Sequence, residues 1–152
     1  MSQPVKRKIL IVEDEVSILR ALHDELTNNG FIVLEAKNGQ EGLEIALREH
    51  PDLILLDIVM PVMDGIAMLD KLRDDAWGEN AQVIILTNLS DAEKARQAMV
   101  KGSYAYLVKS DWKLEEVAAK VSDMLSPLKD KIGRGVSLSD SPEKIAKIVS
   151  GR

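Results

Sequence analysis

The sequence predicts a doubly wound α/β fold in which a five-stranded parallel sheet lies between two layers of helices. Short aliphatic runs alternate with amphipathic segments five times along the chain, which is the pattern of repeated β-α units. Three of these runs, residues 8–12, 52–57 and 82–87, are almost continuously aliphatic, as is typical of parallel strands covered on both faces. Right-handed crossovers in a domain of this size favour the strand order 2-1-3-4-5.

The other elements follow from local signals. A run of alternating polarity at 31–36 is typical of an edge strand, and residues 103–109 supply the fifth strand. Apolar residues at helical spacing predict the first and last helices, with stripes made of Val16, Leu19, Leu22 and Leu26 and of Leu114, Val117, Ala118, Val121 and Leu125. Capping-box spacing marks two further helix starts, at Asn38 with Glu41 and at Ser90 with Glu93. Gly30 stands where a helix C-cap is expected.

The composition is typical of one globular domain with a substantial core. Of the 152 residues, 45% are hydrophobic and 30% are charged. The chain contains no cysteine, so it can form neither a disulfide nor a thiolate metal site, and a reducing compartment is expected. The apolar run at 9–12 is too short for a signal peptide, and no run approaches the roughly 20 apolar residues of a membrane span. We therefore expect a cytoplasmic protein that does not engage a membrane.

The net charge of −5 is unevenly distributed along the chain. Residues 127–152 carry six basic and three acidic side chains, so this segment is +3 and residues 1–126 are −8. An acidic body argues against nucleic acid as a direct partner. We predict one domain over 1–126, followed by a basic linker and a short helical tail with Ser141 as its N-cap. The tail is too short to be a separate output domain.

Charged and polar residues follow the strands at the edge where their carboxyl ends meet. Glu13 and Asp14 follow the first strand, Asp57 ends the third, Thr87 the fourth and Lys109 the fifth. The first and third strands are neighbours in the predicted order, so three carboxylates converge on one crevice. Each pair of like charges about 4 Å apart costs about 4 kcal/mol at an effective dielectric constant near 20. A cation must therefore offset the repulsion, or one acid must be protonated; oxygen ligands without histidine or cysteine suit Mg²⁺.

Helix capping is the simpler explanation for some of these acids. Asp14, Glu15 and Asp64 could each serve as an N-cap or as a first-turn charge. Asp57 differs, because its flanking residues are all apolar and it precedes the next helix by several positions.

The arrangement resembles the receiver domain of bacterial response regulators in two-component signalling. The resemblance covers roughly residues 7–126 and is carried by motifs after four strands: VED at 12–14, PVMDG at 61–65 downstream of Asp57, ILT at 85–87 and YLVK at 106–109. It implies a flavodoxin-like (βα)₅ fold. It also implies a stand-alone single-domain regulator that is not an enzyme, although it assists its own phosphorylation and dephosphorylation.

The resemblance assigns a role to each site residue. Asp57 accepts a phosphoryl group from a sensor histidine kinase or a phosphotransfer protein. The ligands of Mg²⁺, for which Mn²⁺ can substitute, are Asp14, Asp57, the backbone carbonyl of Val59 and, through water, Glu13. The phosphoryl oxygens are covered by Lys109, the Thr87 hydroxyl and the Asn88 N–H. Positioning and charge neutralisation are what phosphoryl transfer requires of a protein.

The resemblance also implies a conformational switch. Phosphorylation draws Thr87 inward and lets Tyr106 rotate into the vacated space. The apolar face of the fourth helix is small, consisting of Ala92, Ala95, Ala98 and Met99, and little burial suits a movable element. We expect the surface of the fourth helix, fifth strand and fifth helix to bind a downstream protein, or a second copy in a phosphorylation-dependent homodimer.

Two residues depart from the family pattern. Ser110 follows Lys109, where receivers usually carry a proline after a cis bond. A cis bond before serine would cost about 2.5–4 kcal/mol, so a trans bond is expected. Asn88 stands where the family prefers a small residue, which leaves the lifetime of the phosphorylated state open.

Three other functions fit the sequence less well. A haloacid-dehalogenase-like phosphatase needs a second aspartate two residues after its nucleophile, where this chain has Val59. A nucleotide or flavin binder is disfavoured because GxxxxGK[ST] and GxGxxG are absent. A pseudo-receiver that only binds protein agrees with Ser110 but not with the full set of site residues. Four aromatic or imidazole residues are assigned no site role: His23, His50, Trp77 and Trp112.

Overall fold

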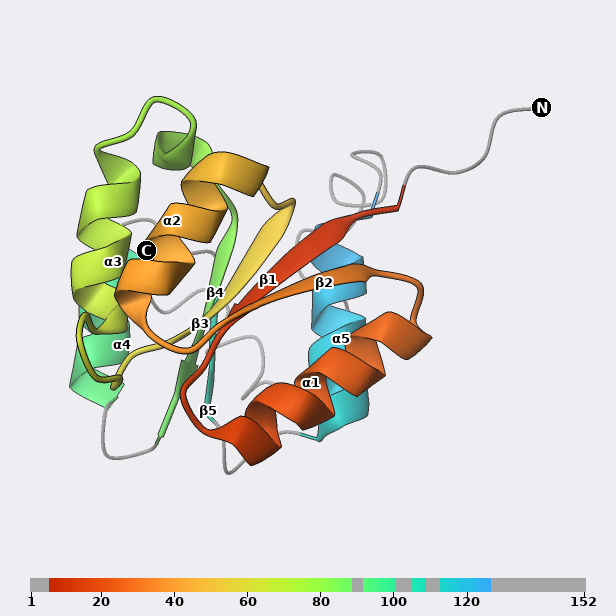
Figure 1. The fold of residues 1–152 in the computed structure, drawn as a ribbon. Helices are drawn as coiled ribbons and strands as arrows, with labels where there is room; N and C mark the ends of the chain where they lie inside the picture. Colours follow the sequence, from red (N-terminus) through yellow and green to blue (C-terminus); the bar gives the residue numbers. More distant parts are fainter. Residues whose placement is uncertain (1–5, 89–91, 101–104, 109–112, 127–152) are drawn as a thin grey trace.

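The computed structural model describes residues 6–88, 92–100, 105–108 and 113–126. In chain order its elements are β1 (Lys8–Val12), α1 (Val16–Asn28), β2 (Ile32–Ala36), α2 (Gly39–Glu49), β3 (Leu53–Asp57), α3 (Gly65–Arg73), η1 (Gly78–Asn80), β4 (Val83–Thr87), α4 (Ala92–Val100), β5 (Ala105–Val108) and α5 (Leu114–Met124). The strands form one parallel sheet in the order β2-β1-β3-β4-β5, which confirms the predicted topology (Figure 1). The predicted tail at 127–152 and the helix start at Ser90 lie outside the described residues.

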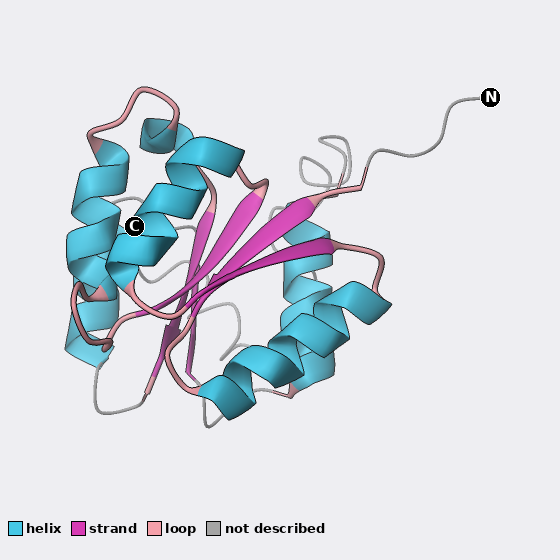
Figure 2. Ribbon diagram, viewed as in Figure 1, coloured by secondary structure: helices cyan, strands magenta, loops and turns pink. Residues whose placement is uncertain are grey.

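The sheet separates two hydrophobic cores. Helices α1 and α5 cover one face, and α2, α3 and α4 cover the other (Figure 2). Successive strand residues point to opposite faces, so Ile9 and Ile11 of β1 pack with α1 and α5, whereas Leu10 and Val12 pack with the opposite layer. Every residue of β3 and β4 is buried, which is why their sequences are aliphatic without alternation.

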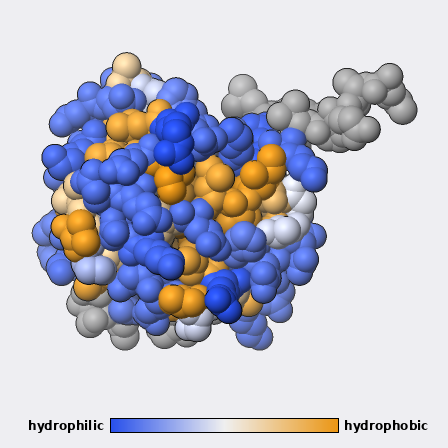
Figure 3. All heavy atoms as spheres, viewed as in Figure 1, coloured by the Kyte–Doolittle hydropathy of each residue, from blue (hydrophilic) through white to orange (hydrophobic). Residues whose placement is uncertain are grey.

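Strand β2 lies at the edge of the sheet, as its alternating sequence predicted. Ile32 and Glu35 are exposed, whereas Ala36 is buried. Figure 3 shows hydrophilic side chains over most of the viewed face, with apolar ones visible along β2 between the helical layers. None of the helices in the described part of the chain combines the length and the apolarity needed to cross a bilayer.

Side-chain caps begin two of the helices that cover the sheet. Asn38 Oδ1 accepts a hydrogen bond from the Glu41 N–H at 2.8 Å, which confirms the predicted start of α2. Asp64 Oδ1 accepts one from the Ala67 N–H at 2.8 Å at the start of α3. The simpler explanation therefore holds for Asp64, because its carboxylate is a helix cap.

Helix α1 ends as predicted, but the first residue of its apolar stripe is not buried. Gly30 has a φ of +93°, its N–H donates to Thr27 O at 3.0 Å, and the Phe31 N–H donates to Leu26 O at 3.1 Å. This is a Schellman motif, in which a glycine tolerates the left-handed conformation. The predicted stripe is wrong at its first position, because Val16 is 50% exposed. A helical side chain lies over the turn that precedes its own Cα, and Val16, as the first residue of the helix, has no such turn.

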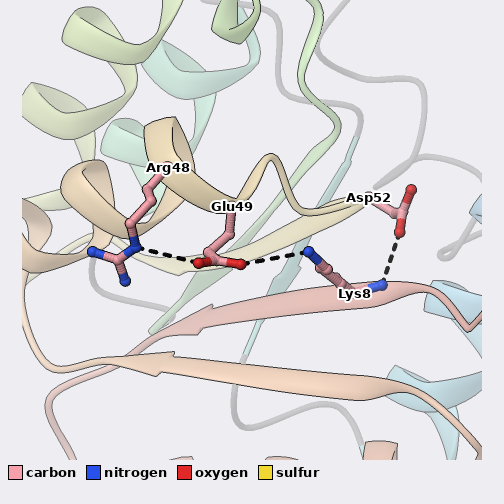
Figure 4. Close-up of polar contacts among 4 residues, drawn as sticks. All are labelled: Lys8, Arg48, Glu49 and Asp52. Carbon is pink, nitrogen blue, oxygen red and sulfur yellow. Dashed lines mark hydrogen bonds and ion pairs between the residues drawn. The ribbon is translucent and has the colours of Figure 1, made fainter.

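A polar clamp ties β1 to β3 and α2 at the amino-terminal edge of the sheet (Figure 4). The Lys8 N–H donates to Asp52 Oδ2 at 2.8 Å, and the Asp52 N–H donates to Lys8 O at 2.8 Å. Arg48 Nε donates to Glu49 Oε2 at 3.2 Å, and Lys8 Nζ lies 3.4 Å from Glu49 Oε1. The hydrogen bond from Arg48, followed by that from Lys8, lowers the pKa of the Glu49 carboxyl.

Candidate functional site

The carboxyl ends of β1, β3 and β4 meet at one edge of the sheet. Val12 of β1 is opposite Leu56 of β3 in the parallel register. Glu13, the residue after Val12, is therefore level with Asp57, the last residue of β3. Thr87 ends the adjacent strand β4, so the three polar residues are brought together by strand register alone.

Three carboxylates converge at this edge, as the sequence predicted. Glu13, Asp14 and Asp57 each offer a carboxylate oxygen, and these oxygens all lie within 4.8 Å of one another. Glu13 is fully buried and Asp57 is 5% exposed, whereas Asp14 is exposed. Glu13 Oε2 accepts a hydrogen bond from the Glu15 N–H at 3.1 Å. Two buried carboxylates this close together concentrate negative charge at the carboxyl edge of the sheet.

The donor set of this cluster fits a hard divalent cation. All of its ligands are carboxylate oxygens, which Mg²⁺ prefers over nitrogen or sulfur. The exposed Asp14 leaves one side of the cluster open to solvent, so an ion that retains several waters can enter. The residues present therefore fit Mg²⁺, with Glu13, Asp14 and Asp57 as the side chains that would hold it.

The loop between β3 and α3, residues 58–64, is anchored close to Asp57. The Gly65 N–H donates to Ile58 O at 2.8 Å, and a Cβ atom on Gly65 would overlap the Asp57 carbonyl oxygen. Only glycine permits this approach, which explains why Gly65 follows the Asp64 cap at the start of α3. Val59 lies in the loop and is 48% exposed; whether its carbonyl is a metal ligand stays a prediction.

The structure describes part of the predicted phosphate-binding set. Thr87 is 1% exposed, and its hydroxyl donates to Asn88 O at 3.0 Å, while the Asn88 side chain is exposed. The backbone of Tyr106 pairs with Ile85 in the sheet. The side chain of Tyr106 lies outside the described residues, as do Lys109 and Ser110 with the predicted trans bond between them.

Sequence reasoning missed one residue that contacts this loop. The Gly39 N–H at the start of α2 donates to Met63 O at 2.8 Å. Asn38 with Glu41 indicated only a helix start, because a hydrogen bond from helix to loop across 24 positions has no local sequence signal.

The contacts found for the two histidines are with residues outside the acid cluster. His23 Nδ1 of α1 lies 2.7 Å from Glu35 Oε2 of β2, a partner that sequence reasoning did not find. The His50 ring stacks on Trp77, with centroids 4.4 Å apart and an interplanar angle of 8°. Trp77 also packs against the core, so this residue has a structural role away from the acid cluster, while Trp112 lies outside the described residues.

The chain belongs to the response regulator receiver domain family. The family's sequence profile matches residues 9–122, which include all three acids. The class is therefore the receiver domain of two-component response regulators, with a flavodoxin-like fold and a role in phosphorylation-dependent signalling.

Curated relatives of two kinds are similar to the chain. Sporulation initiation phosphotransferase F of Bacillus subtilis is 33% identical over 82% of this chain and 98% of its own length. The probable transcriptional regulator ycf27 of Porphyridium aerugineum is 35% identical over 90% of this chain and 55% of its own length. The chain thus spans about half the length of the ycf27 relatives that it matches.

Solved structures show the same fold. The chemotaxis response regulator CheY4 of Vibrio cholerae aligns with a TM-score of 0.73 and 27% identity, covering 80% of this chain and 100% of that chain. The CheY of a CheX–CheY–BeF₃–Mg²⁺ complex from Borrelia burgdorferi aligns with a TM-score of 0.71 and 28% identity, covering 80% and 90% of the two chains.

Proposed function

We propose that the chain is a phosphorylation-dependent switch in which Asp57 accepts a phosphoryl group from a histidine kinase or phosphotransfer protein. The observation that carries the proposal is the convergence of the Glu13, Asp14 and Asp57 carboxylate oxygens within 4.8 Å at the carboxyl edge of the sheet. Membership of the receiver family supports it. An acid in a buried strand end, beside two further acids, is costly unless the site binds a cation.

The proposed reaction is a transfer of phosphorus between two nucleophiles. A carboxylate oxygen of Asp57 attacks in line, the bond from phosphorus to the donor imidazole breaks, and the imidazole nitrogen keeps that electron pair.

Other residues of the site stabilise the charge on the transferred group. Lys109 balances charge on the phosphoryl oxygens, and the Thr87 hydroxyl and Asn88 N–H donate to them. Asp14, Asp57, the Val59 carbonyl and, through water, Glu13 would hold Mg²⁺, or Mn²⁺ in its place. The bound ion would supply positive charge beside the transferred group.

The proposed output surface is formed by α4, β5 and α5. Among the described side chains of α4, only Ala95, Ala98 and Met99 are buried, so little apolar contact holds this helix in place. Phosphorylation draws Thr87 toward the phosphoryl group and lets Tyr106 turn inward, and the changed surface docks on a downstream protein or on a second copy. Hydrogen exchange with and without beryllofluoride should differ most in α4, and a difference confined to α1 and α2 would contradict the proposed surface.

Acetyl phosphate with Mg²⁺ tests the phosphoacceptor directly. Intact-mass measurement should show one added phosphoryl group on the wild-type protein and none on Asp57→Asn. Asp64→Asn is the matched control, because it makes the same change seven residues away in a helix cap and should be labelled like the wild type. Labelling of Asp57→Asn, or failure of the wild type to be labelled or to bind beryllofluoride, would refute the proposal and favour a pseudo-receiver.

A further inference from the structure

Helix α2 begins in direct contact with the loop that follows Asp57. Gly39, the first residue of α2, is buried, and its N–H donates to Met63 O at 2.8 Å. A Cβ atom on Gly39 would overlap the Met63 carbonyl oxygen and lie 3.0 Å from Asp64 O. The helix start and the loop are therefore fitted to each other at backbone level, with no side chain that could yield.

Two further backbone hydrogen bonds restrain the loop. Its ends are joined by the hydrogen bond from the Gly65 N–H to Ile58 O at 2.8 Å, and the Met63 N–H donates to Pro61 O at 2.7 Å. The second bond closes a γ-turn around Val62, whose φ of +68° is strained for a β-branched residue. Strained backbone persists only where its surroundings determine it, and the bond from Gly39 is one of the contacts that do so.

We propose that Gly39 is a positioning residue for the divalent-cation site. The inference rests on the proposed function, in which the Val59 carbonyl is a metal ligand. Val59 and Met63 belong to one short loop closed at both ends, so a displacement of the Met63 carbonyl is passed to the Val59 carbonyl. Helix α2 thereby holds the backbone ligand in place without touching the ion.

The substitution Gly39→Ala isolates this contact. Alanine favours a helix more than glycine does, so a loss of function in this variant cannot come from a weaker helix. Partners that orient a ligand typically change metal affinity by 10–100-fold when removed. Mg²⁺ affinity, measured by calorimetry, should fall about tenfold in Gly39→Ala.

Gly78→Ala is the matched control. A Cβ atom on Gly78 would overlap the Leu72 carbonyl oxygen, so the variant makes the same kind of clash, but before β4 at the opposite edge of the sheet. Its Mg²⁺ affinity should equal that of the wild type even where its urea midpoint falls. Equal losses of Mg²⁺ affinity in the two variants would overturn the proposal, because the effect would then be general destabilisation.

Hydrogen exchange in the wild-type protein gives a test that needs no variant. Coupling between two sites is reciprocal, so saturating Mg²⁺ should slow exchange of the Gly39 amide about tenfold. The Gly42 amide, which donates to Asn38 O within α2 at 2.9 Å, should not change. Mg²⁺ binding that leaves both the Gly39 amide and the affinity of Gly39→Ala unaltered would overturn this inference alone, whereas absence of Mg²⁺ binding to the wild type would overturn it together with the proposed function.

Discussion

Replacing Asp57 with asparagine should stabilise the protein when no divalent cation is present. The carboxylate oxygens of Glu13 and Asp57 lie within 4.8 Å of each other, and both side chains are almost completely buried. At an effective dielectric constant of about 20, such a pair repels by about 3.5 kcal/mol. The amide has the same shape, loses the charge and gives up part of the hydrogen bonding of the carboxylate. We expect a net gain of about 1–3 kcal/mol in the free energy of unfolding.

Urea denaturation at neutral pH and low salt, in the presence of a chelator, measures this gain. Asp64→Asn should change the free energy of unfolding by less than about 0.5 kcal/mol, because asparagine caps a helix as well as aspartate does. Mg²⁺ at a hundred times its dissociation constant should then add about 2.7 kcal/mol to the wild type and much less to Asp57→Asn. A metal-free Asp57→Asn protein that is no more stable than the wild type would show that repulsion within the cluster is not what the cation offsets.

Other substitutions test the structure away from the site, each by urea denaturation. Gly30→Ala should cost about 1–2 kcal/mol through backbone strain alone, because a Cβ atom at this φ of +93° meets nothing within 4 Å; an unchanged stability would contradict the left-handed assignment. Arg73→Ala should cost about 1.5–3 kcal/mol, since its guanidinium donates to the carbonyls of Gly78 and Ala81 at 2.7 and 2.8 Å. A loss no larger than that of Arg48→Ala would count against those bonds. The pKa of Glu49 is lowered on folding, so its contribution is present above its unfolded pKa and is lost as the pH falls through the folded pKa. The stability of Glu49→Gln should therefore fall less than that of the wild type as the pH drops below about 4.5. An identical dependence of stability on pH in the two proteins would refute this.

The sheet and the acid cluster could be predicted because both depend on strand order and on strand ends. Continuous aliphatic runs identify the strands that are buried on both faces, and the alternation around Glu35 identifies an edge. Once two strands are neighbours and parallel, the residues that follow them must meet. The positions of Glu13, Asp14 and Asp57 therefore needed no knowledge of side-chain packing.

Features that depend on how separate segments dock could not be predicted. The hydrogen bond between Gly39 and Met63 joins a helix start to a distant loop, and neither residue carries a local signal for it. The left-handed Val62 is also unexpected, since a β-branched residue rarely adopts positive φ and glycine or asparagine would be the usual indication. Val16 satisfied the helical spacing but is exposed, because spacing does not show which residues of a helix the sheet covers.

The clamp at Lys8 and Asp52 has a consequence for how the central strand finds its alignment during folding. Strand β3 is aliphatic on both faces. A register shift of one residue would therefore exchange its side chains between the two hydrophobic cores with little loss of burial. The bond from the Lys8 N–H to the Asp52 carboxylate, 2.8 Å long, penalises that slip because it needs the Asp52 side chain opposite Lys8. A polar residue just before the strand thus favours the alignment that places its last residue, Asp57, at the acid cluster.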